Sequence, residues 1–504
     1  MIQFANEHAL HSNVSKGESI NMAHIYPVLP DEPLYDGYSV LLDGENLPVL
    51  VTRCSAMPFN RRWPGHQRQI EQSELCGMVR FWFEGEATLT VTASRDFERA
   101  ELRPSSRGVE LRREGRTLTF TITRPGGYSL ELDGYHHNLH IFADAKPVGA
   151  PAPGREVLYY GPGRHEAGIV QLHSHQTVVI DEGAVVYGCF HADGCEDIEI
   201  VGRGILDNSH NVEKILFEVD ELGSGDFDVG NSKREHTIHM LNCKNIRLEG
   251  FVIRDSLLYN VGLWGCEDID IRDLRIVGCW RYNSDGIDFH NCRHGHVQGC
   301  FVRTFDDSVC YKGHDGWPSY CEDITVEDCV VWCDWDHCLE IGAECCAEHM
   351  RRLVFRNIDV IRSLDIALNI GNVDYGTVSD ILYEDIRVEY DPVHQKPQLQ
   401  RSDEAEFQID PNSRWLPQLM CCAIIFHPEY SENKPERGHI RGVTFRNIRV
   451  TAPSMPPNHF SGFDAEHLTE DILIDGLYLN GQRMNSLDKA NVTIGDFARN
   501  IRLS

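Results

Sequence analysis

The sequence is poor in basic residues. It has 47 lysines and arginines against 77 aspartates and glutamates, which gives a formal net charge of -30. Nucleic acids and anionic membranes are bound through basic patches, so this balance argues against both as partners and disfavours a long polyanionic substrate. Otherwise the 504-residue chain, with 41% hydrophobic and 25% charged residues, has the composition of an ordinary globular protein.

Targeting features are also lacking. The opening stretch, residues 1–24, has no basic start, no apolar core and no small-residue cleavage site. No apolar run elsewhere is long enough to span a bilayer. We therefore expect a cytoplasmic protein with no membrane partner. A homo-oligomer is compatible with the sequence, but no pattern in it indicates one.

The 18 cysteines lack the paired Cys-x-x-Cys modules that are typical of structural zinc sites. Without a secretion signal, free thiols are expected rather than disulfides. Most of the cysteines recur inside strand-like repeats, so we predict that they are buried thiols, and we expect neither a metal nor another cofactor. The alternative is a zinc site formed by Cys333, Cys338, Cys345 and Cys346.

A short phrase recurs through the second half of the chain. It reads "CEDIEIVG" at 195–202, "CKNIRLEG" at 243–250, "CEDIDIRD" at 266–273 and "CEDITVED" at 321–328. Each copy is followed by two more strand-like segments, and the pattern has no helical periodicity, which excludes leucine-rich and ankyrin solenoids. The pattern predicts an all-β protein whose residues 155–504 form a parallel β-helix, with one coil per repeat.

The first 150 residues have a different pattern. Strand-like segments at 37–54, 77–94, 108–122 and 127–144 are joined by Gly, Asn and Asp turns. Their even spacing predicts an antiparallel β-sandwich over residues 1–150, and the Pro/Gly-rich stretch 145–157 is expected to be the linker. Two long stretches, 206–236 and 391–420, interrupt the repeats. We expect them to line or cover the binding face or to make oligomer contacts.

The third strands of successive repeats can be aligned by their apolar residues. One interior ladder contains Ile287, Val309, Leu339 and Leu368, and a second contains Phe289, Tyr311, Ile341 and Ile370. The outward positions between the ladders are Asp288, Cys310, Glu340 and Asn369. The alignment predicts a solvent-facing strip over three coils that carries Asp285, Asp306, Asp307, His337, Glu340 and Lys312.

Three clustered aspartates favour catalysis over a merely solvated polar edge. Carboxylates one coil apart raise each other's pKa, and such a shift keeps a general acid protonated near neutral pH. Glycoside hydrolysis needs one carboxyl group to protonate the leaving oxygen and another to activate water. A histidine hydrogen-bonded to the acid would tune its protonation. For Asp288 alone, the polar-edge and functional interpretations stay evenly balanced.

The segments "NSDGID" (283–288), "DDSVCYKG" (306–313) and "DHCLEIGA" (336–343) resemble the polygalacturonase family of right-handed parallel β-helix glycoside hydrolases. The resemblance covers about residues 160–390. It implies that Asp306 is the general acid, that Asp285 and Asp307 activate water, and that His337 is the tuning base. It also implies inversion of the anomeric configuration.

One part of that family's signature is missing. An Arg-Ile-Lys segment that binds a substrate carboxylate should follow, but Ala367 and Asn369 stand at the cationic positions. Glu340 would also repel a uronate. With the predicted sandwich, these departures resemble the dextranase and isopullulanase family, which acts on neutral α-glucans. We expect a neutral oligosaccharide or polysaccharide, with a uronate as the alternative because of Lys312.

The predicted substrate contacts are Asp288, Lys312, Glu340, Asn369, Trp335 and Tyr375. The last two are chosen from a larger aromatic set that also contains Trp280, Tyr282, Trp317 and Trp332, because aromatic rings can stack on sugars. Two other classes of function stay open. A β-helix lyase or sugar transferase is disfavoured because the strip has no arginine, and a lyase would need Ca²⁺ held by carboxylates. A non-catalytic carbohydrate-binding solenoid would not need three clustered aspartates.

Overall fold

The computed structural model describes residues 21–55, 73–147, 154–212, 235–280, 283–392, 395–398, 406, 408, 410–427, 431 and 436–504. Within these ranges the chain is β-strand and loop, with two 3-10 helices, η2 (Ser105–Arg107) and η3 (Ser209–Val212). The all-β prediction is therefore confirmed. Of the helices in the described ranges, none is long and apolar enough to cross a membrane. Much of the two predicted insertions, including 213–234 and 399–405, lies outside the described residues.

The N-terminal part consists of two β-sheets packed face to face. The first contains β1 (Met22–Ile25), β4 (Leu50–Cys54), β5 (Glu74–Glu84), β7 (Ala100–Arg103), β10 (Gly126–Leu132) and β11 (Leu139–Ala145). The second contains β2 (Tyr38–Leu42), β3 (Glu45–Leu47), β6 (Ala87–Ala93), β8 (Arg112–Glu114) and β9 (Thr117–Ile122). Their alternating apolar residues form one shared core, as a sandwich requires.

One pair of strands in this sandwich departs from the antiparallel prediction. Strands β5 and β11 pair in parallel, with Ile141 opposite Val79. Between them the chain passes through β6 and β9 of the other sheet. Because no hairpin joins β5 to β11, turn geometry does not fix their relative direction.

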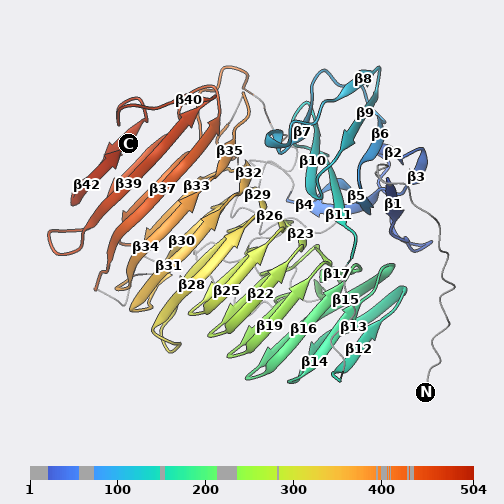
Figure 1. Ribbon diagram of the computed structural model, residues 1–504, viewed down its shortest axis with the longest axis horizontal. Helices are drawn as coiled ribbons and strands as arrows, with labels where there is room; N and C mark the ends of the chain where they lie inside the picture. The colour runs from blue at the N-terminus through green and yellow to red at the C-terminus, as the bar shows by residue number, and fades with distance from the viewer. Residues whose placement is uncertain are drawn as a thin grey trace, which may run out of the picture.

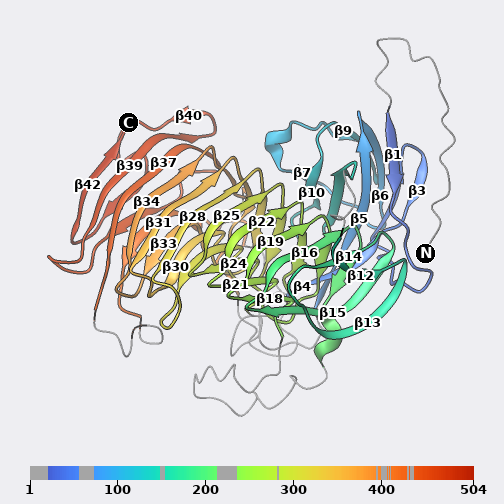
Figure 2. The same ribbon diagram turned by 60° about the horizontal axis from the view of Figure 1, so that its bottom comes forward.

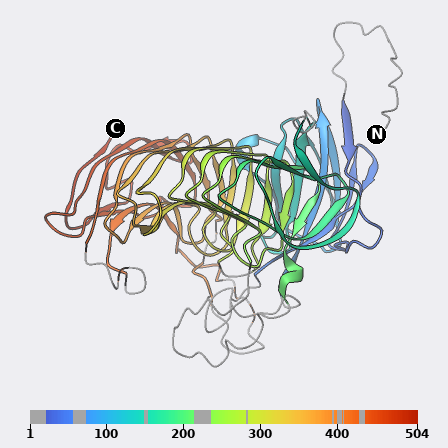
Figure 3. The same ribbon diagram turned by 90° about the horizontal axis from the view of Figure 1, so that it is seen from below.

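The remaining 31 strands form the predicted parallel β-helix, whose coils stack along the long axis of the molecule (Figures 1 and 3). The first strands of the coils are β12 (Glu156–Tyr160), β14 (Gln176–Ile180), β16 (Glu196–Gly202), β19 (Lys244–Glu249), β22 (Glu267–Arg272), β25 (Arg293–Gln298), β28 (Tyr320–Glu327), β31 (His349–Arg356), β34 (Thr377–Glu384), β37 (His439–Thr451), β39 (Thr469–Leu479) and β42 (Ala498–Leu503). The second strands are β17 (Ile205–Asp207), β20 (Val252–Arg254), β23 (Arg275–Gly278), β26 (Phe301–Thr304), β29 (Val330–Cys333), β32 (Asp359–Arg362) and β35 (Arg387–Glu389).

The third strands form the sheet on which the aspartate phrases lie. They are β13 (Gly163–Gln171), β15 (Ala184–Asp193), β18 (Ile238–Leu241), β21 (Val261–Trp264), β24 (Ile287–His290), β27 (Val309–Gly313), β30 (Leu339–Cys345), β33 (Ile366–Asn372), β36 (Gln418–Ile424), β38 (Asn458–Ser461) and β41 (Val492–Ile494), and the short β40 (Gln482–Arg483) pairs with β39. The predicted register is confirmed, because Ile287, Val309, Leu339 and Leu368 are successive partners.

The recurring phrase has a structural explanation in its cysteine and in the residue two places later. The thiols of Cys266 and Cys292 donate to the carbonyl oxygens of Met240 and Leu263 in earlier coils, at 3.4 and 3.3 Å. The third residue of each phrase has a positive φ, for example 57° at Asp268, which Asp and Asn tolerate better than most side chains. The phrase therefore marks the corner of each coil.

All 18 cysteines are free thiols, and all but Cys195 are buried, which confirms the expectation of buried thiols. Three of the four cysteines of the zinc alternative point at different backbone groups: Cys333 donates to Asp306, Cys338 to Arg362 and Cys345 to Gly371. This arrangement does not bring their sulfur atoms together around one point.

The sandwich lies against the second strands of the β-helix, such as β23, β26 and β29, which are labelled on its side of the β-helix in Figure 1, and Figure 2 gives a second view of the two parts. An apolar cluster joins the two parts, with Met78 and Phe142 from the sandwich packed among Val252, Phe301 and Trp332. Buried arginines of the β-helix cross this interface. Arg254, Arg275, Arg303 and Arg362 contact Glu32, Asp144, Asn138 and Glu131 respectively. Charges paired in this way fix how the two parts dock.

Candidate active site

The turns between second and third strands bring the predicted catalytic residues together. Asp285 precedes β24, Asp306 and Asp307 precede β27, and His337 precedes β30. Because these three strands are neighbours in the sheet, the turns lie side by side. Carboxylate oxygens of Asp285, Asp306 and Asp307 lie within 4.8 Å of one another.

The sequence predicted a solvent-facing strip, but in the structure the strip is largely buried. Asp288 is 0% exposed, Glu340 1% and Asp285 1%, and even Asp306 and Asp307 are only 6% exposed. Side chains on successive coils are about 4.8 Å apart, so the longer ones cover their neighbours. The ammonium group of Lys312 lies 3.8 Å from Asp288 and 5.6 Å from the ring centre of Tyr259.

Lys312 lies at the centre of the carboxylates rather than at their edge. Its Nζ is 3.2 Å from Asp307 Oδ2, 3.3 Å from Asp285 Oδ2 and 4.0 Å from Glu344 Oε2. Although burial acts to lower its pKa, the surrounding acidic groups raise that pKa well above its usual value. The three aspartates are also a group that could hold a metal ion, but an ammonium group already lies against two of them.

Asp306 has surroundings that favour its protonated form, although two backbone amides that donate to it act in the opposite direction. Its Oδ1 accepts a hydrogen bond from the amide of Asp307 at 3.1 Å, and its Oδ2 accepts one from the amide of Asn283 at 3.2 Å. Burial raises the pKa of Asp306 well above its usual range, and the charges of Asp336 and Asp307 raise it further. The expected repulsion between carboxylates therefore helps to keep a proton on Asp306, but burial raises the pKa of Asp306 more.

Asp307 has the opposite environment. Its two carboxylate oxygens lie 3.2 Å from His337 Nδ1 and 3.2 Å from Lys312 Nζ. Burial acts to raise the pKa of Asp307, but the two cationic groups outweigh it and hold that pKa below the usual range. Two adjacent aspartates thus have pKa values shifted in opposite directions, which is the pattern of an acid and base pair.

Asp285 completes the trio beside Lys312. Burial, followed by the charge of Asp288, raises the pKa of Asp285 well above its usual value. Its Oδ2 lies 3.3 Å from Lys312 Nζ. Asp285 therefore faces the same ammonium group as Asp307, but its surroundings favour the neutral form more than those of Asp307 do.

His337 contacts Asp307 rather than Asp306. Its Nδ1 also lies 2.8 Å from Asp336 Oδ1 and 3.5 Å from Glu340 Oε2. Burial acts to lower the pKa of His337, but Asp336, Glu340 and Asp307 together raise it well above the usual value. The sequence suggested that His337 tunes the acid, Asp306. An imidazolium at this position instead stabilises the negative charge on Asp307.

Glu340 and Asn369 occupy adjacent outward positions, as the register predicted. Burial raises the pKa of Glu340 to about 8, while burial, with a smaller contribution from Asp307, raises that of Asp288 to about 7. Both side chains are covered, so neither presents a free carboxylate to a sugar. Asn369 is 5% exposed.

The raised pKa of Glu340 predicts a pH-dependent stability. Its proton is favoured more in the folded than in the unfolded protein, so folding is penalised as pH rises from about 4.5 to about 8. The parent protein should lose unfolding free energy between pH 5 and pH 9. We expect Glu340→Gln to lose less, by about a few kcal/mol, which is the free energy that corresponds to the pKa shift. Urea denaturation at both pH values measures this. Equal losses in the variant and the parent protein would contradict it.

The predicted aromatic contacts lie in different places. Trp335 stacks on Phe305, with ring centres 5.9 Å apart, beside the turn that carries Asp306. The hydroxyl of Tyr375 donates to Asp315 at 2.9 Å, beyond the ends of the third strands. Of the other aromatics considered, Trp280 and Trp332 are buried and Trp317 is half-buried, whereas Tyr282 lies outside the described residues.

A row of aromatic rings next to the carboxylates was not predicted from the sequence. Trp264 and His290 stack with ring centres 4.0 Å apart, and His290 Nδ1 lies 2.8 Å from His314 Nε2. Extending the strand alignment by two residues would have found them, because Trp264, His290 and Lys312 are register partners. Burial and the neighbouring positive groups lower the pKa of His290 well below its usual value, which favours the neutral imidazole at this position.

Comparisons with known proteins agree with this geometry. Residues 170–392 match the family model of glycosyl hydrolases family 28. No curated protein sequence matches the chain. Among solved structures, Dex49A from Penicillium minioluteum has a TM-score of 0.55 at 13% identity, covering 94% of this chain and 96% of that chain.

Two further solved structures are similar at lower TM-scores. The hyperthermoactive exopolygalacturonase from Thermotoga maritima has a TM-score of 0.49 at 19% identity, covering 66% of this chain and 85% of that one. The family 28 exopolygalacturonase from Yersinia enterocolitica has a TM-score of 0.43 at 11% identity, covering 90% and 98%. With residues 170–392 matching glycosyl hydrolases family 28, the resemblance to the polygalacturonase family is confirmed, and the protein is a glycoside hydrolase with a parallel β-helix fold.

Proposed function

We propose that the protein hydrolyses α-glycosidic bonds of a neutral oligosaccharide or polysaccharide, with Asp306 as general acid. The observation that carries this assignment is the unequal surroundings of the two adjacent aspartates. Lys312 and His337 both lie against Asp307, whereas Asp306 is buried beside the negative charge of Asp336. One carboxyl group can therefore keep a proton while its neighbour stays ionised.

In the proposed reaction the two aspartates have different roles. Asp306 gives its proton to the glycosidic oxygen as the bond to the anomeric carbon breaks. Asp307, held ionised by Lys312 and His337, accepts a proton from the attacking water, and Asp285 orients that water from the other side of Lys312. General acid and base catalysis of this kind accelerates a reaction by about 10²–10⁴-fold for each group.

A neutral substrate is supported by the surroundings of Lys312, the cation that the sequence offered as a partner for a uronate. Lys312 is 5% exposed, and its ammonium group is surrounded by four protein carboxylates within 4.0 Å. Asn369 on β33 pairs with Glu340 on β30, so the positions where a basic segment would bind a uronate carry no cationic side chain. A substrate carboxylate would therefore meet no compensating positive charge at these positions.

A substrate panel tests the proposal. We expect hydrolysis of at least one of the α-1,6-, α-1,4- and α-1,3-linked glucose oligosaccharides, and a rate at least about tenfold lower on tetragalacturonate because of charge repulsion. Product formation is followed by chromatography. Faster hydrolysis of the galacturonate would overturn the neutral substrate, and an eliminated, unsaturated product that requires Ca²⁺ would indicate a lyase instead.

The stereochemical course needs its own measurement. Inversion is implied by the family resemblance, whereas carboxylate oxygens within 4.8 Å of one another are closer than is usual for inverting enzymes. We expect proton NMR to show the β-anomer as the first product of an α-linked substrate. If the α-anomer forms first, the enzyme retains configuration, and Asp307 or Asp285 would be a nucleophile.

A further inference from the structure

The turns that carry the catalytic residues are attached to each other at their base. Thr304 Oγ1 donates to the carbonyl oxygen of Asp306 at 2.7 Å, and the amide of Asp334 donates to the carbonyl oxygen of Thr304 at 2.9 Å. The thiol of Cys333 donates to the same Asp306 carbonyl oxygen at 3.1 Å. The positions of Asp306 and Asp307 therefore depend on the start of the next turn, residues 334–337.

Arg303 fastens that next turn from behind. Its Nε and Nη2 donate to the two carboxylate oxygens of Asp334 at 2.9 and 3.3 Å, and its guanidinium lies 3.7 Å from the ring centre of Trp332. Trp332 Nε1 donates to Asp334 at 2.8 Å. A two-pronged arginine pair of this kind fixes direction as well as distance.

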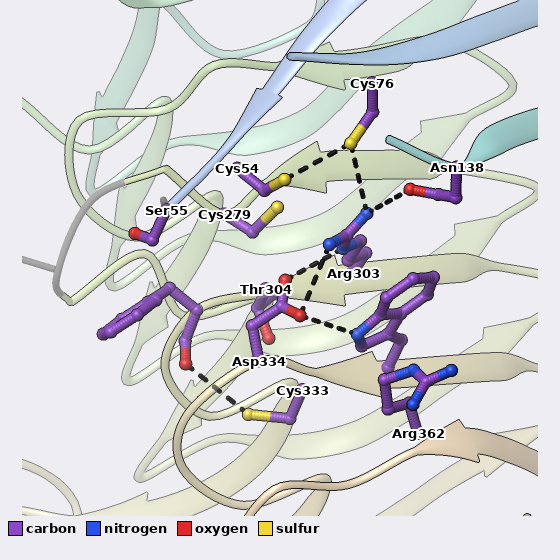
Figure 4. A network of polar contacts seen from close by, with 12 residues as sticks. Cys54, Ser55, Cys76, Asn138, Cys279, Arg303, Thr304, Cys333, Asp334 and Arg362 are labelled. Carbon is purple, nitrogen blue, oxygen red and sulfur yellow. Dashed lines mark hydrogen bonds and ion pairs between the residues drawn. The ribbon is translucent and has the colours of Figure 1, made fainter. Parts of the chain in front are cut away.

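The third guanidinium nitrogen of Arg303, Nη1, contacts the N-terminal sandwich. Its Nη1 donates to Asn138 Oδ1 at 2.8 Å and lies 3.8 Å from the sulfur of Cys76 (Figure 4). Asn138 is itself held by a hydrogen bond to Ser129 at 3.0 Å. The side chains of Arg303 and Asp334 are 1% and 9% exposed, so water does not readily replace these contacts.

We infer that Arg303 is a positioning residue through which the sandwich holds the two turns that carry Asp306–Asp307 and Asp336–His337. The chain of contacts runs from Asn138 through Arg303 to Asp334 and then to the backbone beside Asp306. The inference rests on the function proposed above, because it assigns a catalytic consequence to this attachment.

Arg275 provides a matched control within the same interface. It is also a buried β-helix arginine, and it pairs with Asp144 of the sandwich at 2.8 Å. It lies at the start of β23, and its other hydrogen bonds are to the carbonyl oxygens of Leu274 and Gly299. Removing Arg275 therefore weakens the interface without touching the catalytic turns.

The test compares Arg303→Met with Arg275→Met. We expect Arg303→Met to lower kcat by about 10- to 100-fold, the range that a small displacement of reacting groups produces, with KM changed less than threefold. Arg275→Met should keep kcat within about twofold at a similar loss of thermal stability. Arg303→Lys, which keeps the charge but cannot reach Asn138 and Asp334 together, should fall between. Asn138→Ala should lower kcat in the same direction.

A second readout does not depend on activity. In Arg303→Met, the imidazole of His337 should titrate at lower pH by NMR, because its turn moves away from Asp307, whereas Arg275→Met should leave it unchanged. Equal kcat values and equal His337 titrations in the two variants would overturn the inference. If Arg303→Met shifts the His337 titration but wild-type protein hydrolyses none of the saccharides, the positioning role stands and the proposed function fails.

Discussion

Replacing Asp306 with asparagine is expected to lower kcat by about 10²–10⁴-fold, the contribution of a well-placed general acid. Asparagine has nearly the same shape, and its oxygen can still accept the hydrogen bond from the Asp307 amide. It has no proton to give to the leaving oxygen. Burial favours the neutral form of Asp306, so the substitution removes no required charge. The amide of Asn283 loses its acceptor, so we expect a loss of about 0.5–1.5 kcal/mol in unfolding free energy.

The leaving group distinguishes loss of the acid from general damage to the site. An aryl glycoside whose phenol is strongly acidic needs no protonation as it leaves. Asp306→Asn should therefore lose much less activity on such a substrate than on an oligosaccharide. If both substrates lose activity equally, Asp306 is not the proton donor.

Asp336→Asn is a suitable control for the same reaction. Asp336 is partly exposed and contacts His337 at 2.8 Å, and its charge helps to raise the pKa of Asp306. Without that charge, the pKa of Asp306 falls, and an acid with a lower pKa loses its proton at lower pH. We expect the alkaline limb of the pH–rate profile to move to lower pH, with kcat at the optimum changed by less than about tenfold.

The β-helix and its register could be predicted because they follow from local sequence. Apolar residues with a period of two fix which side chains point inward, and one slipped residue would turn Ile287 and Phe289 outward. The turn phrases are equally local, since Asp268 and its equivalents adopt a positive φ wherever the coil turns. Asp285 and Asp307 occupy equivalent positions on neighbouring coils, and Asp306 is the residue before Asp307, so the register brings the three aspartates together.

The electrostatics of the site could not be predicted in the same way. Whether an outward side chain is solvated depends on the length of its neighbours on the adjacent coils, and the position of Lys312 among the carboxylates follows a local irregularity between Tyr311 and Gly313. Sequence alignment places residues in rows but does not say which neighbour a flexible side chain will contact.

The role of the interface was hidden for a similar reason. Arg303 lies in "FVRT" (301–304), where an outward arginine has the pattern of a solvated strand position. Only the docking of the sandwich buries it. The likeness to Dex49A over nearly the whole of both chains indicates that this two-part arrangement is a shared fold, and in this chain the arginine pairs provide its polar contacts.

Lys312→Met is expected to have the largest effect on stability. It removes the ammonium group that lies within 4.0 Å of Asp285, Asp288, Asp307 and Glu344. Removing one partner from a buried ionic cluster costs about 3–5 kcal/mol, because the remaining charges have lost their compensation. Guanidinium denaturation of the variant at pH 7 measures this loss.

The control is Lys244→Met. Lys244 also pairs with a glutamate, Glu267 at 3.2 Å, but its side chain is 58% exposed. An exposed pair contributes only about 0–1 kcal/mol. Similar losses in the two variants would show that Lys312 does not compensate the buried carboxylates.

The pH dependence of the Lys312→Met effect identifies its cause. Lys312 itself stays protonated in both folded and unfolded protein from pH 5 to pH 8, because its pKa is raised by its acidic neighbours. The carboxylates supply the dependence: even with Lys312 present, burial raises the pKa of Asp288 to about 7. At pH 5 they take up protons in the variant and need no cation, whereas at pH 8 they must ionise or hold their protons at a cost. The destabilisation should therefore be larger at pH 8 than at pH 5. Adding Asp288→Asn to the variant should recover part of it at pH 8, and no recovery would contradict the compensation by Lys312.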